Sequence, residues 1–331
     1  MRNRTLSAIV FSLLSLSLAL PADARPALRL VRAAPANKAA KDAGSSATEA
    51  PLAFTRLGKG PAIVLLHGLG GDRAVWGEEI VRLSPKYTVL AVDLPGHGQS
   101  AGPKAAPATP VTPGQAVTLP LIDLQKVAQQ VAKLIRSEKL APAVVVGHSI
   151  GGEVAAWLPL VDREAVRGVL LVDTTLAPPS ITDSERTRLR ADLKREMIPT
   201  LRRFFAPITS SATQLDKVVA SAQRVSPAVF MGYLDYAMNN ELDEKAGEIA
   251  VPVHLLAGPL LIANNNDQVK AHLALQQAGL TAIPNLTYDY FPSSKHWLFW
   301  DEPERYRDAV DRFLNTVTRP AVSGTKGRPK G

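Results

Sequence analysis

The sequence predicts an α/β protein, a mostly parallel central sheet with helices on both faces. From residue 52 onward, short apolar runs alternate with helical patterns. The runs are apolar throughout rather than at every second position, which is typical of strands buried on both faces of a sheet. Alternation of this kind favours a parallel sheet that is covered on both sides.

Each predicted strand leads into a loop or a helix. The expected strands are 62–66, 88–92, 144–146, 169–172, 253–256 and 286–291. The expected helices are about 74–83, 121–137, 150–158 and 303–317. Ligands of such sheets bind at the carboxyl ends of the strands. The polar residues that follow those ends are therefore candidate site residues: His67, Asp93, Ser149, Asp173 and His296.

One long segment breaks the alternation. Residues 178–247 contain helical apolar stripes and no convincing strand, and Ser226-Pro227 is typical of a helix start. We therefore expect a helical cap at 178–247, inserted into a core formed by 52–177 and 248–318. Because the insertion leaves and re-enters the sheet on its ligand side, it should cover the site. The Pro- and Ala-rich residues 101–120 should form a surface loop.

The ends of the chain look different from its middle. Residues 1–24 combine Arg2 and Arg4, an apolar stretch and Ala22-Asp23-Ala24, which is the pattern of a cleavable signal peptide. The apolar stretch is shorter than the roughly 20 residues of a membrane span. We expect export to the periplasm or the medium, with no stable membrane insertion after cleavage. Residues 25–51 should be a disordered linker and 319–331 a disordered basic tail.

The net charge of +8 belongs to these ends. Residues 1–24, 25–51 and 319–331 carry +1, +3 and +4, which leaves the folded part neutral. A nucleic-acid partner is therefore not expected, and a small-molecule substrate is. The chain has no cysteine, which excludes disulfides and thiolate chemistry. No metal-ligand spacing occurs, and no cofactor is expected.

The most specific motif is Gly147-His148-Ser149-Ile150-Gly151, between a predicted strand and a predicted helix. A G-x-S-x-G sequence in that setting is a nucleophile elbow. The turn is so sharp that small residues must flank it, and the serine is exposed at its tip. The N-terminus of the following helix offers backbone N–H groups to a developing oxyanion.

Four motifs in order resemble those of the α/β-hydrolase superfamily, over about residues 52–318. They are His67-Gly68-Leu69-Gly70-Gly71, Asp93-Leu94-Pro95-Gly96-His97-Gly98-Gln99-Ser100, the elbow, and Ser293-Ser294-Lys295-His296-Trp297. The resemblance implies an α/β-hydrolase fold with a helical cap.

The resemblance also implies roles by position. The backbone N–H groups of Leu69 and Ile150 would form the oxyanion hole. His148, beside the nucleophile, should line or support the site. His67 belongs to a loop motif in which it should hydrogen-bond backbone, and it is a candidate for substrate contact as well.

His296 is the expected general base, because it follows the last predicted strand. The third member of the triad stays open between two residues. The usual place for the acid, shortly after Gly258, holds no carboxylate. Asp267 lies farther along that loop, 29 residues before His296, and Asp173 lies at the end of the preceding predicted strand. The acid must hold the tautomer of the imidazole and stabilise its positive form.

The leading functional hypothesis is a serine hydrolase that cleaves small or medium esters, lactones or amides through an acyl-enzyme on Ser149. Carbon–carbon bond hydrolysis is an alternative within the same fold. A non-catalytic binding protein is an alternative of a different class. It is favoured only because the usual place of the triad acid, shortly after Gly258, holds no carboxylate. A membrane-associated lipase is disfavoured, because the basic tails lack an amphipathic stripe.

Overall fold

The computed structural model describes residues 50–102, 122–178, 181–239, 241–259, 261 and 268–318. The predicted signal peptide and basic tail lie outside these residues, as do nearly all of the predicted linker and most of the predicted loop at 101–120. None of the helices in these ranges is long and apolar enough to cross a bilayer.

Within the described residues, seven strands form one sheet, which confirms the predicted α/β architecture. Their order across the sheet is β1-β3-β2-β4-β5-β6-β7, and every neighbouring pair is parallel apart from β1 and β3. The bounds are β1 Phe54–Leu57, β2 Ala62–Leu66, β3 Thr88–Val92, β4 Ala143–His148, β5 Val166–Val172, β6 Val253–Ala257 and β7 Leu286–Tyr290.

The two edge strands depart from the sequence prediction. β1 was not predicted, because its four residues are only half-buried or exposed and give no apolar run. β7 was predicted as a buried apolar strand, and that description is wrong. It includes Asp289, and its side chains are half-buried or exposed because, among the described residues, one of its edges has no neighbouring strand.

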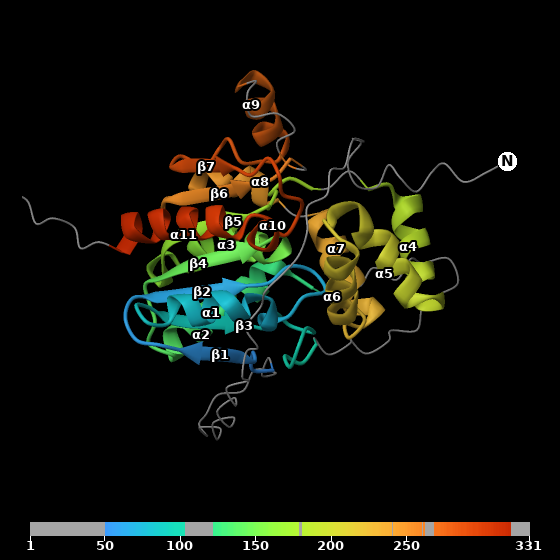
Figure 1. Ribbon diagram of the computed structural model, residues 1–331, viewed down its shortest axis with the longest axis horizontal. Helices are drawn as coiled ribbons and strands as arrows, with labels where there is room; N and C mark the ends of the chain where they lie inside the picture. The colour runs from blue at the N-terminus through green and yellow to red at the C-terminus, as the bar shows by residue number, and fades with distance from the viewer. Residues whose placement is uncertain are drawn as a thin grey trace, which may run out of the picture.

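Helices cover both faces of the sheet (Figure 1). α1 and α11 lie on one face, where Arg82 of α1 bonds to Asp311 of α11. α2 and α3 pack together on the other. The bounds are α1 Gly77–Leu83, α2 Leu124–Ser137, α3 Ile150–Val161, α9 Gln268–Gln277, α10 Leu298–Asp301 and α11 Pro303–Thr318.

A second group of helices lies beyond the carboxyl ends of the parallel strands (Figure 1). These helices follow β5 and precede β6 in the chain, and α7 begins at the predicted Pro227, after the N-cap Ser226. The bounds are α4 Asp183–Arg195, α5 Met197–Phe205, α6 Ala212–Ala222 and α7 Pro227–Ala237. We call α4–α7 the cap helices. The short α8, Leu242–Lys245, lies instead beside β6 and packs against α3 (Figure 1).

Two glycines allow the cap helices to approach the core closely. A Cβ on Gly70 would lie 2.7 Å from Cβ of Ala222 on α6, and a Cβ on Gly96 would lie 2.6 Å from Val229 on α7. Both glycines also have positive φ, which other residues rarely adopt. The loops after β2 and β3 are therefore shaped to receive α6 and α7.

Candidate active site

Ser149 stands at the tip of a strained turn between β4 and α3. Its φ of 54° and ψ of −126° are unusual for a residue with a side chain. A Cβ on Gly147 would overlap the backbone of Gly151, and one on Gly151 would overlap the backbone of the loop after β2. The two glycines of the motif are thus required by close approach.

The imidazole of His296 is held by a carboxylate. Its Nδ1–H donates to Oδ2 of Asp173 over 2.7 Å. The other oxygen, Oδ1, accepts from the backbone N–H of Gly258 over 3.0 Å. Asp173 is 7% exposed and has a φ of 46°, so the strand end and the loop after β6 fix it. Asp267, the other candidate acid, lies outside the described residues.

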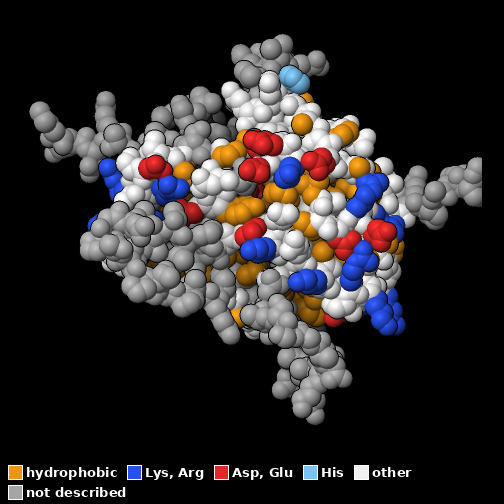
Figure 2. All heavy atoms as spheres, turned by 180° about the vertical axis from the view of Figure 1, so that it is seen from behind, with side chains coloured by type: hydrophobic (Ala, Val, Ile, Leu, Met, Phe, Trp, Pro, Cys, Tyr) orange, Lys and Arg blue, Asp and Glu red, His pale blue; other side chains and the backbone are white. Residues whose placement is uncertain are grey.

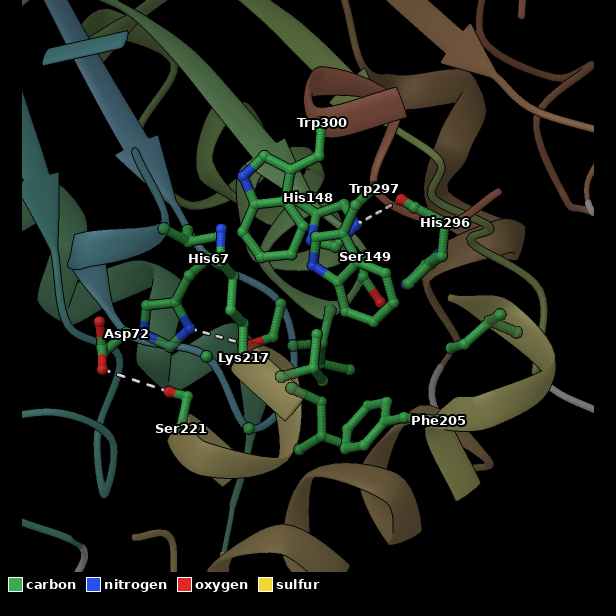
Figure 3. Close-up of a pocket in the computed structure, with 18 of the residues that line it drawn as sticks. His67, Asp72, His148, Ser149, Phe205, Lys217, Ser221, His296, Trp297 and Trp300 are labelled. Atoms are coloured by element: carbon green, nitrogen blue, oxygen red, sulfur yellow. Dashed lines mark hydrogen bonds between the residues drawn. The ribbon is translucent and has the colours of Figure 1, made fainter. Parts of the chain in front are cut away.

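Ser149 and His296 line one cavity of about 710 Å³ between the core and the cap helices. Figure 3 labels both residues among the side chains that line this cavity. The volume lies within the usual range of small-molecule sites. Its remaining walls are mostly apolar, from Phe205, Trp297 and other aromatic side chains.

Leu69 and Ile150, the residues predicted to form an oxyanion hole, both line this cavity. Ile150 is the first residue of α3, where a backbone N–H has no partner within the helix. Neither N–H donates to an acceptor among the described residues. Two backbone donors thus border the cavity that contains the Ser149 hydroxyl.

His148 supports the loop that carries His296. Its Nε2–H donates to the carbonyl oxygen of His296 over 2.8 Å, and the two rings are 4.5 Å apart. From the cap side, Ile208 accepts a bond from the backbone N–H of His296. Burial, and after it the proximity of His296, lowers the pKa of His148 well below its usual value, so this ring stays neutral.

His67 joins two loops rather than presenting a free ring nitrogen to the cavity. Its Nδ1–H donates to the carbonyl of Gly68, and its Nε2 accepts from the backbone N–H of Leu94. His97 acts similarly, accepting from the N–H of Gly70 over 3.1 Å. Burial lowers the pKa of His67 to about 4, and burial followed by the neighbouring His67 lowers that of His97 to about 3.

Several residues of the cavity had no signal in the sequence. Glu153, one turn along α3 from Ser149, is buried at the cavity wall, and burial raises its pKa to about 8. Phe205 and Lys217 come from the cap helices, and Trp300 from α10. No short motif identifies them, because their positions depend on how the cap helices pack against the core.

On the face seen in Figure 2, basic and acidic side chains are interspersed among the coloured residues. Within the described ranges, no group of three His, Asp or Glu side chains is arranged to hold a metal ion.

Comparisons with known proteins agree with this architecture. The sequence pattern of the alpha/beta hydrolase family matches residues 63–309. The pimeloyl-[acyl-carrier protein] methyl ester esterase of Nitrosomonas europaea is 27% identical over 77% of this chain and 96% of its own length. An uncharacterized protein of Mycobacterium tuberculosis is 27% identical over 81% of this chain and 79% of its own.

Among solved structures, the enol-lactonase of Burkholderia xenovorans superposes with a TM-score of 0.65 at 19% identity, covering 80% of this chain and 96% of its own. That likeness shows a shared fold. The family pattern spans most of the chain and includes the elbow, the Asp173 strand end and the His296 loop. The chain is therefore a hydrolase and belongs to the alpha/beta hydrolase family.

Proposed function

We propose that this hydrolase cleaves carboxylic esters through an acyl-enzyme on Ser149. The observation that carries the proposal is the Asp173–His296 hydrogen bond of 2.7 Å, with His296 and a serine of positive φ in the wall of one cavity. The curated relative from Nitrosomonas europaea is a methyl ester esterase by name, which favours ester substrates.

In this mechanism His296 Nε2 takes the proton of Ser149 as the hydroxyl oxygen attacks the carbonyl carbon of the ester. The backbone N–H groups of Leu69 and Ile150 donate to the oxyanion of the tetrahedral intermediate. His296 then gives the proton to the leaving alkoxide, and an acyl-Ser149 remains. A water molecule, deprotonated by His296, releases the acid in the second half of the cycle.

Asp173 has two roles in this cycle. It accepts from His296 Nδ1–H, so that Nε2 is left free to take the serine proton. Its negative charge also stabilises the imidazolium that forms at each tetrahedral stage. Because Gly258 N–H donates to its second oxygen, the carboxylate keeps one orientation throughout.

Replacing the nucleophile tests the proposal. Ser149→Ala should abolish hydrolysis of p-nitrophenyl butyrate and covalent labelling by a fluorophosphonate probe. Ser137→Ala, at the exposed end of α2, is the matched control and should keep both. Equal labelling of Ser149→Ala and the wild type would refute the assignment, and no labelling of the wild type would favour a binding protein.

We also propose that the enzyme acts outside the cytoplasm, since residues 1–24 have the pattern of a signal peptide. Mass spectrometry of the protein from an exporting host should then find a mature chain beginning at Arg25. A chain that retains residues 1–24 would refute cleavage.

A further inference from the structure

Three of the four acidic side chains that line the cavity have cationic partners. Asp72 binds Arg224, Glu78 binds Arg307, and Glu79 binds both Arg82 and Arg307. Among the described residues, the pairing leaves one cation of the cavity wall without an acidic partner. That cation is Lys217 of α6.

The surroundings of Lys217 do not neutralise it. Its neighbour in the sequence, Asp216, is bound to Arg202. The ammonium nitrogen lies 5.8 Å from the centre of the Trp300 ring, a contact that attracts a cation without removing its charge. Lys217 is an exposed residue that also lines the cavity, so its charge stands at the opening.

A row of aromatic rings connects Lys217 with the reacting groups. The Trp300 ring stacks on that of Trp297 at 5.9 Å with an angle of 12° between their planes. The Trp297 ring lies 5.1 Å from the ring of His296. Figure 3 shows Lys217 reaching from α6 toward Trp300, with Trp297 and His296 beyond. The row offers an apolar surface to a carbon chain, with His296 at one end and an ammonium at the other.

We propose that the preferred ester of this enzyme carries a carboxylate at the end of a carbon chain, and that Lys217 is the specificity-determining residue that binds it. The inference rests on the ester hydrolysis proposed above. A single ammonium matches the single charge of a carboxylate. A phosphate monoester, with about two charges at neutral pH, would need a second free cation.

Matched substrate pairs test the inference. Monomethyl adipate and methyl hexanoate differ only in a terminal carboxylate on the acyl side, and ω-acetoxyhexanoate and hexyl acetate differ in the same way on the alcohol side. For each pair, the ratio of kcat/KM for the charged ester to that for the neutral ester is measured by proton release. The wild type should favour the charged ester in at least one pair, and that pair identifies the side that faces Lys217.

In Lys217→Met the ratio for that pair should fall about tenfold, because a hydrogen bond to a charged group is lost, while the neutral ester changes little. Lys217→Arg should keep the preference and Lys217→Glu should reverse it. Added salt should weaken it in the wild type, since the ammonium is exposed. Lys194→Met, on the exposed surface of α4, is the matched control and should behave as the wild type.

Two outcomes would overturn the inference and can be told apart. If all the esters are hydrolysed but neither pair shows a preference that depends on Lys217, ester hydrolysis stands and the carboxylate subsite is wrong. If no ester, p-nitrophenyl butyrate included, is hydrolysed, the proposed function fails and the subsite fails with it.

Discussion

The two halves of the cavity are built in different ways. The core half holds Ser149 and Asp173 at strand ends, both with positive φ, and His296 in the loop between β7 and α10. The cap half consists of side chains from α5, α6 and α7, held by packing and by long-range contacts. Under the proposed function, the reaction chemistry depends on the core half, and the selection of a charged substrate depends on a side chain of the cap half.

The largest effect should come from the acid of the core half. Asp173→Asn should lower kcat by about 10³- to 10⁴-fold, because the amide can favour the wrong imidazole tautomer and cannot stabilise the imidazolium. The fold should survive, since the amide oxygen can still accept from Gly258 N–H. Asp289→Asn on β7, outside the cavity, is the control for kcat. Full activity of Asp173→Asn would transfer the role of the acid to another residue, Asp267 first.

The difference between the two halves also explains which site residues could be predicted from the sequence. A turn as tight as the elbow admits few residue types, so Gly147, Ser149 and Gly151 form a readable motif. The acid stayed open between Asp173 and Asp267 because its identity depends on which carboxylate reaches His296, a contact between residues 123 positions apart. Lys217 and Trp300 were not predicted at all, since side-chain packing between separate helices leaves no short pattern.

The strands also differ in how well the sequence predicts them, because the buried strands were predicted and the edge strand β1 was not. β2 is apolar at every position and β3 at every position after Thr88, and the predicted bounds of both strands agree with the structure. The four-residue edge strand β1 has a solvent-facing side and was missed. The helices of the cap were predicted as a class, from apolar stripes. Their placement against Gly70 and Gly96 was not predicted, because it depends on packing between residues far apart in the chain.

A second prediction for the core half concerns Gly152, where the backbone lies close to a neighbouring side chain. A Cβ on Gly152 would collide with the side chain of Thr174, whose hydroxyl bonds to the carbonyls of Ser149 and Val172. Gly152→Ala should therefore lower the free energy of unfolding by about 1–3 kcal/mol and also reduce kcat. At Gly77, by contrast, an added Cβ would meet nothing within 4 Å apart from its chain neighbours and its own helix backbone. Gly77→Ala should therefore raise the free energy of unfolding by up to about 1 kcal/mol. Equal urea midpoints for the two variants would contradict this prediction.

The core half should also control the dependence of stability on acid pH. His67, His97 and His148 are buried, and burial lowers their pKa values, so the three rings are neutral. Below pH 6.5 these histidines therefore bind protons in the unfolded chain but not in the folded chain. The free energy of unfolding should therefore fall as the pH drops from 6.5 toward 4, by up to about 1.4 kcal/mol per pH unit for each ring. Urea titrations across this range measure the slope, and a flat profile would contradict the prediction.

Glu153 should act in the opposite direction. Its pKa is raised to about 8 by burial, so between pH 4.5 and 8 the unfolded carboxyl loses a proton that the folded one keeps. Stability is lost as the pH rises through this window. Glu153→Gln removes the titration, so the difference in unfolding free energy between variant and wild type should shift in favour of the variant from pH 4.5 to 8. A difference that is constant with pH would refute this assignment.

The smallest effect should come from the contact where the two halves meet. The buried hydroxyl of Tyr233 on α7 donates to the carbonyl of Pro95 over 3.0 Å, and its ring lies against His97, which accepts from Gly70 N–H. Tyr233→Phe should cost about 1 kcal/mol of stability, because one buried hydrogen bond is lost. Since His97 keeps its bond to Gly70, kcat should stay within about twofold of the wild type.

The Tyr233→Phe measurement decides how separate the two halves are. Tyr87→Phe is the control, because its hydroxyl bonds to none of the described residues. A lower melting temperature with unchanged kcat would mean that the cap helices add stability and do not change the position of the loop that contains Leu69 and Gly70. A fall in kcat beyond tenfold would mean that α7 sets the position of Gly70 and hence of the Leu69 N–H beside it. In that case the catalytic geometry would depend on cap side chains as well as on the strand ends.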